Sequence, residues 1–267
     1  MWVIILRYLR DKWKTIVTYC VAGFGFMWIY VAMFPSIQAQ SESYAKLTES
    51  FPKAFMKAFG IESLNLDHIE NFLSIEHFSM VWPIMAILLV TSLAASAIAK
   101  DIENGTMELS LARPIKRLSI FFGRYITGLI AIVVFVITSI FAIVPLAALH
   151  NVSYMFSHFV TTAILAALFC WAMFSLGMMF SAFFSDKGKV SMSMGGLLIL
   201  MYVINIISGL KESLQNLEYL SFFHYFTAEN TLVHNTLKPE AVWVFIGIAV
   251  ACTAVGAWRF SKRDIAV

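Results

Sequence analysis

Six long apolar stretches, separated by polar segments, constrain this chain more than any other feature. They cover residues 15–35, 78–99, 119–149, 158–184, 190–209 and 241–260. Each is long enough for a transmembrane helix, which needs about 20 residues, and none alternates as the strands of a membrane barrel do. Only 13% of the residues are charged, about half the share of a soluble domain. The sequence therefore predicts an all-α integral membrane protein with six transmembrane helices, forming a single transmembrane domain over residues 1–267.

The third apolar stretch is longer than a bilayer requires. It holds about 31 residues, and at about 1.5 Å per residue its helix would exceed a hydrocarbon core of about 30 Å. We expect this helix to tilt or to project beyond the membrane.

The basic residues are distributed unevenly between the segments that join the stretches. Residues 1–14, 100–124, 185–189 and 259–267 hold 14 of the 19 Lys and Arg residues. Segments rich in Lys and Arg stay in the cytoplasm. The pattern predicts that both termini are cytoplasmic (N-in/C-in) in a multi-pass protein of the cell (plasma) membrane.

The first 14 residues form an amphipathic pattern. Trp2, Ile5, Leu6 and Leu9 can face lipid, while the basic and acidic residues of this segment face water. We expect an N-terminal interfacial helix that lies in the membrane plane before the chain turns inward. A plain basic flank of the first span is the alternative.

The two longer external segments carry aromatic residues. In the first, a four-residue spacing from Phe51 to Phe59, with Pro52 and Gly60 at its limits, predicts a short helix with an apolar stripe. The last external segment, residues 210–240, has an aromatic cluster around His224, which we interpret as re-entrant or interfacial. Packing is the simpler explanation for both features; a proton or metal role is the alternative for His224.

Several kinds of chemistry are missing from the sequence. No ionisable residue lies near the middle of a predicted span, although proton- and ion-coupled carriers need one. No phosphate-binding GxxxxGK[ST] or GxGxxG pattern occurs, and the three cysteines lie singly in apolar stretches, which indicates neither disulfides nor a metal site. The net charge of +3 is too small to indicate a nucleic-acid partner. We predict no catalytic, cofactor-binding or metal-binding residues, and any energy source must lie on another chain.

The first cytoplasmic segment, residues 100–117, has its own local structure. Asn104 and Gly105 predict a tight turn, Thr106 can cap a following helix, and Glu108 suits the first turn of that helix. Pro114 ends it. The sequence predicts a short cytoplasmic helix held between two spans. A partner protein could bind this helix.

This segment resembles a known family. Glu103-x-Gly105-Thr106-x-Glu108 followed by Leu111-x-x-Pro114-x-x-Arg117 is similar to the signature of ABC type-2 exporter permeases. The resemblance covers essentially the whole chain. It includes the C-terminal Phe260-Ser-Lys-Arg263-Asp264 sequence and the aromatic segments around residues 51–60 and 223–226.

The resemblance implies a function. In that family the permease pairs with a separate cytoplasmic ABC ATPase and with a second permease copy, identical or related, in the lipid bilayer. ATP and magnesium bind the ATPase, so the permease is not itself an enzyme. The loop after the second span enters a cleft on the ATPase as the coupling helix. The resemblance assigns this ATPase-coupling role to Glu103, Gly105, Thr106, Glu108, Pro114 and Arg117.

Other interpretations remain open from the sequence alone. Residues 100–117 could be only a basic cytoplasmic loop. The chain could be a gradient-driven secondary transporter, which the apolar spans disfavour, or an interfacial membrane enzyme that uses His224 with Glu229. As an exporter it would suit a hydrophobic or amphipathic cargo.

Overall fold

The computed structural model of the chain describes residues 1–40, 67–108, 115–210 and 212–264. Most of these residues are helical, and they contain no strand. In chain order the helices are α1 (Trp2–Gln38), α4 (Ile69–Glu76), α5 (Trp82–Ala97), α6 (Ala99–Glu103), α8 (Arg117–Ile140), α9 (Ile143–His150), α10 (Phe156–Phe183), α11 (Lys187–Leu210), α12 (Phe222–Tyr225) and α13 (Pro239–Lys262). Shorter helical turns cover His77–Val81, Glu212–Leu220 and Glu229–Val233.

Six of the described segments are long and apolar enough to cross a membrane: α1, Ile69–Ala97, Arg117–His150, α10, α11 and α13. This confirms the predicted all-α architecture with six spans. The bounds of the last three differ from the predicted ones by at most three residues. The predicted helix at residues 51–60 lies outside the described residues.

The second span begins earlier than predicted. Helix α4 leads through a π-helical turn, His77–Val81, into α5. The π turn falls directly before Pro83, which has no N–H to bond back to the preceding turn. Trp82 N–H accordingly bonds the His77 carbonyl, five residues back. The chain is therefore helical from Ile69, and both Glu70 and His77 fall within this span.

One prediction about the first span is wrong. The N-terminal segment is helical, but α1 runs unbroken from Trp2 to Gln38, so no separate interfacial helix turns into the membrane. The third span, Arg117–His150, is as long as predicted but is interrupted at Phe141 and Ala142, between α8 and α9; its tilt or projection beyond the membrane stays a prediction. Pro145 accounts for that break, since its ring crowds the carbonyl of Phe141 four residues earlier.

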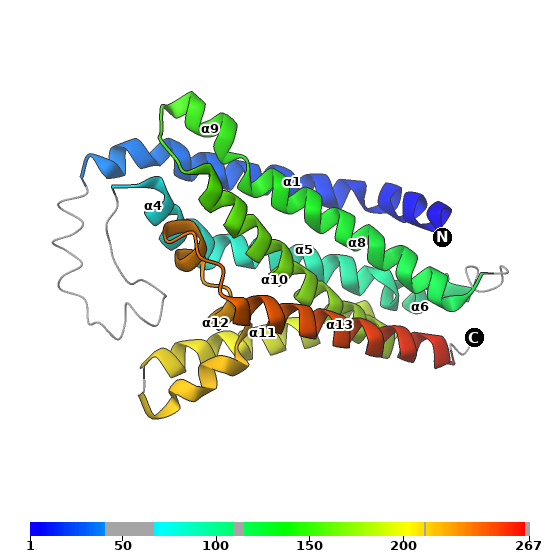
Figure 1. The fold of residues 1–267 in the computed structure, drawn as a ribbon. Helices are drawn as coiled ribbons and strands as arrows, with labels where there is room; N and C mark the ends of the chain where they lie inside the picture. Colours follow the sequence, from blue (N-terminus) through cyan, green and yellow to red (C-terminus); the bar gives the residue numbers. More distant parts are fainter. Residues whose placement is uncertain (41–66, 109–114, 211, 265–267) are drawn as a thin grey trace.

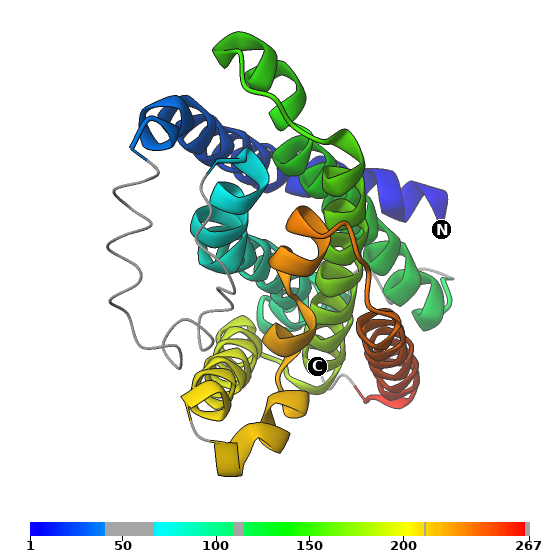
Figure 2. The same cartoon turned by 60° about the vertical axis from the view of Figure 1, so that its left-hand side comes forward.

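Helix α10 lies at the centre of the bundle. It packs against α5, α8, α11 and α13. Of the residues in an apolar 18-residue stretch of α10, 67% are buried, against 17% in the corresponding stretch of α11. In Figure 2 cyan α5 and yellow α11 lie to the left of green α10, and red α13 lies to its right. Both termini and α6 lie at one end, called here the terminal end (Figure 1). Helices α4 and α9 lie at the opposite end.

Small residues let the inner helices approach closely. A Cβ on Gly177 would lie 2.6 Å from the Cβ of Ala94 on α5. A Cβ on Gly128 would lie 2.0 Å from the ring of Phe174, so the Phe174 ring of α10 packs directly against the backbone of α8 at this glycine. By contrast, no atom lies within 4 Å of the position of such a Cβ on Gly195, which leaves that part of α11 open.

A buried polar cluster joins three spans. The hydroxyl of Tyr125 on α8 lies 2.6 Å from the Ser175 hydroxyl on α10 and 2.7 Å from the Thr253 hydroxyl on α13. Trp171 Nε1–H donates to the same oxygen at 2.7 Å. Satisfied polar groups of this kind hold helices together in a bilayer, where water cannot replace them.

Candidate functional site at the terminal end

The terminal end is organised around the short helix α6. The chain bends at Ile98, where φ is −129° and ψ is −54°, so α6 leaves the axis of α5. This bend exposes two backbone N–H groups that the regular helix would have used. The buried Ser181 hydroxyl of α10 accepts both, from Ile98 at 3.2 Å and from Ala99 at 3.0 Å. The start of α6 is thereby attached to the central helix.

An ion pair attaches α6 to α8. Arg124 Nη2 donates to the Asp101 carboxylate at 2.5 Å, and Arg124 Nη1 donates to the Ala97 carbonyl. The Arg124 side chain is only 8% exposed. Charge-assisted hydrogen bonds of this kind are stronger than neutral ones. The guanidinium therefore joins the end of α5 and the middle of α6 to one position on α8.

Helix α1 joins the same group of contacts. The Arg124 guanidinium carbon lies 5.6 Å from the centroid of the Tyr8 ring, a cation–π arrangement. The Tyr8 hydroxyl lies 3.3 Å from the Ser96 hydroxyl on α5. Tyr8 therefore connects α1 with the helices on either side of α6.

The end of α6 reaches α11. The Glu103 carboxylate accepts a hydrogen bond from the backbone N–H of Lys187, the first residue of α11, at 2.9 Å. A carboxylate at a helix N-terminus satisfies an unpaired N–H and interacts favourably with the helix dipole. With this contact, α6 is linked directly to α8, α10 and α11, and through Arg124 to Tyr8 on α1.

The predicted turn follows α6. Gly105 has φ of +68°, a left-handed conformation that a glycine adopts without strain, and its N–H bonds the Ile102 carbonyl. Thr106 donates its hydroxyl proton to the Asp101 carbonyl at 3.3 Å, back into α6. Met107 is fully buried, and the half-buried Glu108 is helical where the described part of this segment ends.

Arg117 and the C-terminal segment form a second group of contacts. Arg117 at the start of α8 donates to the Arg263 carbonyl. Arg263 in turn donates to the carbonyls of Ala182 at 2.8 Å and Phe184 at 3.0 Å. Burial lowers the pKa of Arg263 from its usual value. The C-terminal segment thus fastens the start of α8 to the end of α10.

A family model described as ABC-2 family transporter protein matches residues 5–265. The chain belongs to the ABC-2 transporter family. The match includes all six spans and the described contacts around α6. A search of curated proteins returned no match. This ABC-2 permease is therefore a multi-pass membrane protein and the membrane component of a transporter. Permeases of the ABC-2 family in general work with an ABC ATPase.

The structure distributes the predicted coupling residues of the ABC-2 permease as follows. Glu103, Gly105 and Thr106 lie together at the end of α6, Glu108 follows them, and Arg117 lies at the base of α8. Pro114 lies outside the described residues. The role of all six in coupling stays a prediction.

Sequence reasoning missed the side chains that hold α6 in place. Arg124 carried a signal, since it is one of only two charged residues within the six apolar stretches. Asp101, Ser181 and Tyr8 had none, because a single polar residue on a helix does not reveal which neighbour it faces. Their roles depend on helix packing.

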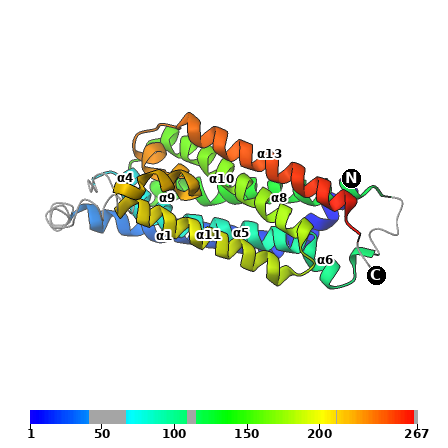
Figure 3. The ribbon, with the colours of Figure 1, turned by 90° about the horizontal axis from the view of Figure 1, so that it is seen from below.

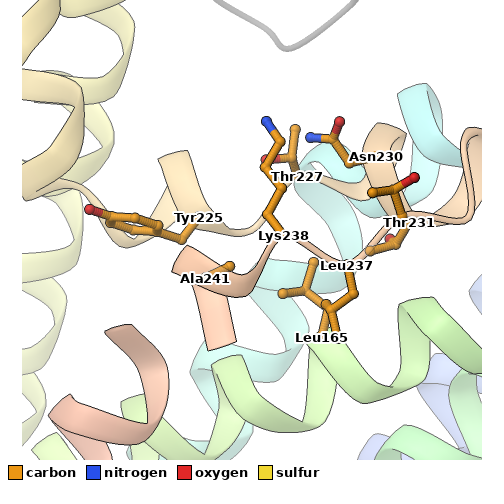
Figure 4. Close-up of a pocket in the computed structure, with 9 residues that line it drawn as sticks. Leu165, Tyr225, Thr227, Asn230, Thr231, Leu237, Lys238 and Ala241 are labelled. Carbon is orange, nitrogen blue, oxygen red and sulfur yellow. The ribbon is translucent and has the colours of Figure 1, made fainter. Parts of the chain in front are cut away.

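No group of three or more His, Cys, Asp or Glu side chains that could hold a metal ion occurs in the described part of the chain. The Nδ1 atom of His224 lies 3.8 Å from Oε2 of Glu218. Burial lowers the pKa of His224 from its usual value. A shallow hollow at the opposite end is lined by residues that include Tyr225, Asn230 and Lys238 (Figure 4). The residues that line it do not include His224 or Glu229, the pair named for the enzyme alternative.

Proposed function

We propose that this ABC-2 permease is the transmembrane subunit of an ABC exporter, and that a separate cytoplasmic ATPase drives it through the segment 99–117. One observation carries the proposal: α6 is fastened directly to three spans, and to a fourth through Arg124. Its contacts run to Ser181 on α10, to Arg124 on α8 and to the start of α11, and Tyr8 adds α1 through Arg124.

The arrangement supports a mechanical role for α6. Force applied to this segment by a partner would reach the spans through hydrogen bonds and an ion pair, which resist displacement more than apolar contacts do. Closure of two ATPases on ATP would then rock the helices around α6 and reshape a pathway between two permeases. ATP and magnesium would bind the ATPase, so the permease supplies motion and no chemistry.

The proposed orientation places the terminal end in the cytoplasm of a cell whose plasma membrane holds the protein. The segments with most of the basic residues meet at this end, as do both termini (Figure 1). The positive-inside rule supports that side. An ATPase in the cytoplasm would then have direct access to residues 103–108.

The side formed by α1, α5 and α11 suits contact with a second permease. Within one chain, only 17% of the apolar 18-residue stretch of α11 is buried, and only 22% of that of α1. A Cβ added to Gly195 or Gly196 would meet no atom of another part of the chain within 4 Å, and an open glycine surface of this kind allows a second helix to approach closely. We assign the pathway to this side of the bundle.

Co-purification tests the proposal. A tagged permease expressed with the ABC ATPases of its own organism should retain one of them through detergent extraction in about a 1:1 ratio. An ABC ATPase from an unrelated transporter serves as the control and should not be retained. Retention of none of these ATPases under conditions that preserve the permease fold would contradict the proposal.

A further inference from the structure

Arg263 directly follows α13, and its guanidinium lies against the end of α10. The residue is only 7% exposed. Its Nη1 donates to the carbonyls of Ala182 at 2.8 Å and Phe184 at 3.0 Å, and its Nη2 donates to the Ser185 hydroxyl. The last carbonyls of an α-helix have no partner within the helix and form the negative end of its dipole. Arg263 therefore caps the C-terminal end of α10.

The main chain of Arg263 also holds the start of α8. Arg117, the first residue of α8, donates to the Arg263 carbonyl. Close to this contact, the ring centroids of Phe121 on α8 and Phe260 on α13 lie 6.2 Å apart, and both side chains are fully buried. A polar contact and an aromatic contact therefore join the start of α8 to the end of α13. Through Arg263 the same connection continues to α10.

Both limits of the segment 99–117 are consequently fastened to one short part of α10 and the turn that follows it. At the first limit, two backbone N–H groups at the start of α6 donate to Ser181 Oγ. At the last limit, Arg117 is connected through Arg263 to the two carbonyls and the hydroxyl just described. Figure 3 shows α6 and the last turns of red α13 at this same end of the bundle. We call residues 181–185 the α10 anchor.

The α10 anchor belongs to the helix at the centre of the bundle. Helix α10 packs against α5, α8, α11 and α13. The approach of α13 is especially close, because a Cβ on Gly256 would lie 3.1 Å from the Cα of Met179, two residues before the anchor. A displacement that enters at both limits of the segment would therefore reach one helix, and from it the helices packed around it.

We propose that Arg263 is a positioning residue for coupling, which holds the far limit of the segment 99–117 on the α10 anchor so that α10 receives motion from both limits. The inference rests on the proposed function and specifies the span that receives the motion. Arginine suits this role because its planar guanidinium donates to several acceptors at once, whereas a lysine ammonium is a flexible point charge. The competing explanation is that Arg263 only stabilises the fold.

A distance measurement on the permease alone tests the connection without the ATPase. In a variant whose native cysteines are replaced by alanine, spin labels are attached to Lys116→Cys before α8 and Lys189→Cys in α11, both at exposed positions. Arg263→Gln should broaden the distribution of distances between the labels, measured by double electron–electron resonance. The control Lys262→Gln, at an exposed neighbouring position, should not change it. An unchanged distribution in Arg263→Gln would overturn the connection.

Stimulation of the partner ATPase separates positioning from stability. Hydrolysis is measured in proteoliposomes and divided by the amount of ATPase retained. Arg263→Gln should retain the ATPase but lower its stimulation about fivefold, and Lys262→Gln should match the wild type. Arg263→Lys, which keeps the charge and can still donate to a carbonyl, should give an intermediate value, and it carries the test if Arg263→Gln does not fold.

Two outcomes would overturn the inference in different ways. A role in stability alone would reduce the amount of complex and leave the stimulation per retained ATPase unchanged in both Arg263 variants. That result would remove the positioning role and leave the proposed function intact. A wild-type permease that retains no ATPase would instead contradict the proposed function itself, and the coupling role of Arg263 with it.

Discussion

Arg124 illustrates what a single residue does in this permease. Its guanidinium bonds α6 through Asp101, bonds the end of α5 through a carbonyl, and lies over the ring of Tyr8 on α1. The sequence reveals that a charge sits in an apolar stretch, but the three partners come from segments 23 to 116 residues away. Their convergence is a property of helix packing, which a pattern along one helix does not contain.

Removal of either partner of the buried ion pair should destabilise the protein. Arg124→Met leaves Asp101 without its cation and should lower stability by about 3 kcal/mol, at the low end for buried pairs because Asp101 is 28% exposed. Asp101→Asn should cost less, because an amide oxygen can still accept from Arg124. Thermal unfolding in detergent measures both.

The control for that experiment is Arg259→Met. Arg259 lies 5.6 Å from the Phe183 ring but forms no ion pair within the described residues. Its replacement should shift stability by less than about 1 kcal/mol. Equal losses for Arg124→Met and Arg259→Met would show that the ion pair does not hold α6.

Helices in this chain are predicted well by apolar periodicity where nothing interrupts them. The spans α10, α11 and α13 match their predicted bounds closely because each is a single apolar run between polar segments. The errors arose where local chemistry changes the path. Pro145 marks the break between α8 and α9 in the sequence itself. The unbroken course of α1, which packs against α8, has no clear sign in residues 1–14.

The close approach of α8 and α10 makes Gly128 sensitive to substitution. Gly128→Ala would place a Cβ against the buried ring of Phe174, which itself packs on Tyr125 at 5.4 Å between centroids. We expect a loss of about 1–3 kcal/mol from overpacking. Gly247→Ala on α13, where the new Cβ meets no atom within 4 Å, is the matched control and should be neutral or stabilising. Comparable destabilisation of both variants would contradict the described packing of α8 on α10.

The whole molecule has two ends of different character. The terminal end carries polar and charged contacts between α6, α8, α11 and the C-terminal segment, whereas aromatic packing extends toward the opposite end, as in the stack of Trp82 on Phe226. Composition and charge distribution predicted six spans and an orientation. They did not predict which spans α6 joins, because that requires the three-dimensional arrangement.

Cysteine labelling tests the orientation. In a variant whose native cysteines are replaced by alanine, Asp264→Cys at the terminal end should react with a membrane-impermeant maleimide only after the cells are permeabilised. Asn235→Cys at the opposite end, which is also exposed, should react in intact cells. The reverse pattern would place the termini outside and remove α6 from the reach of a cytoplasmic ATPase.

The central claim is that the segment after α5 transmits ATP-driven motion, and stimulation of the partner ATPase in proteoliposomes tests it most directly. The wild-type permease should raise ATP hydrolysis by the co-purified ATPase. Glu108→Lys should abolish this stimulation with unfolding temperature unchanged, since Glu108 forms no ion pair within the described residues. Asp264→Lys, the same charge reversal on an exposed residue outside the segment, should retain it. Full stimulation with Glu108→Lys would contradict the coupling role.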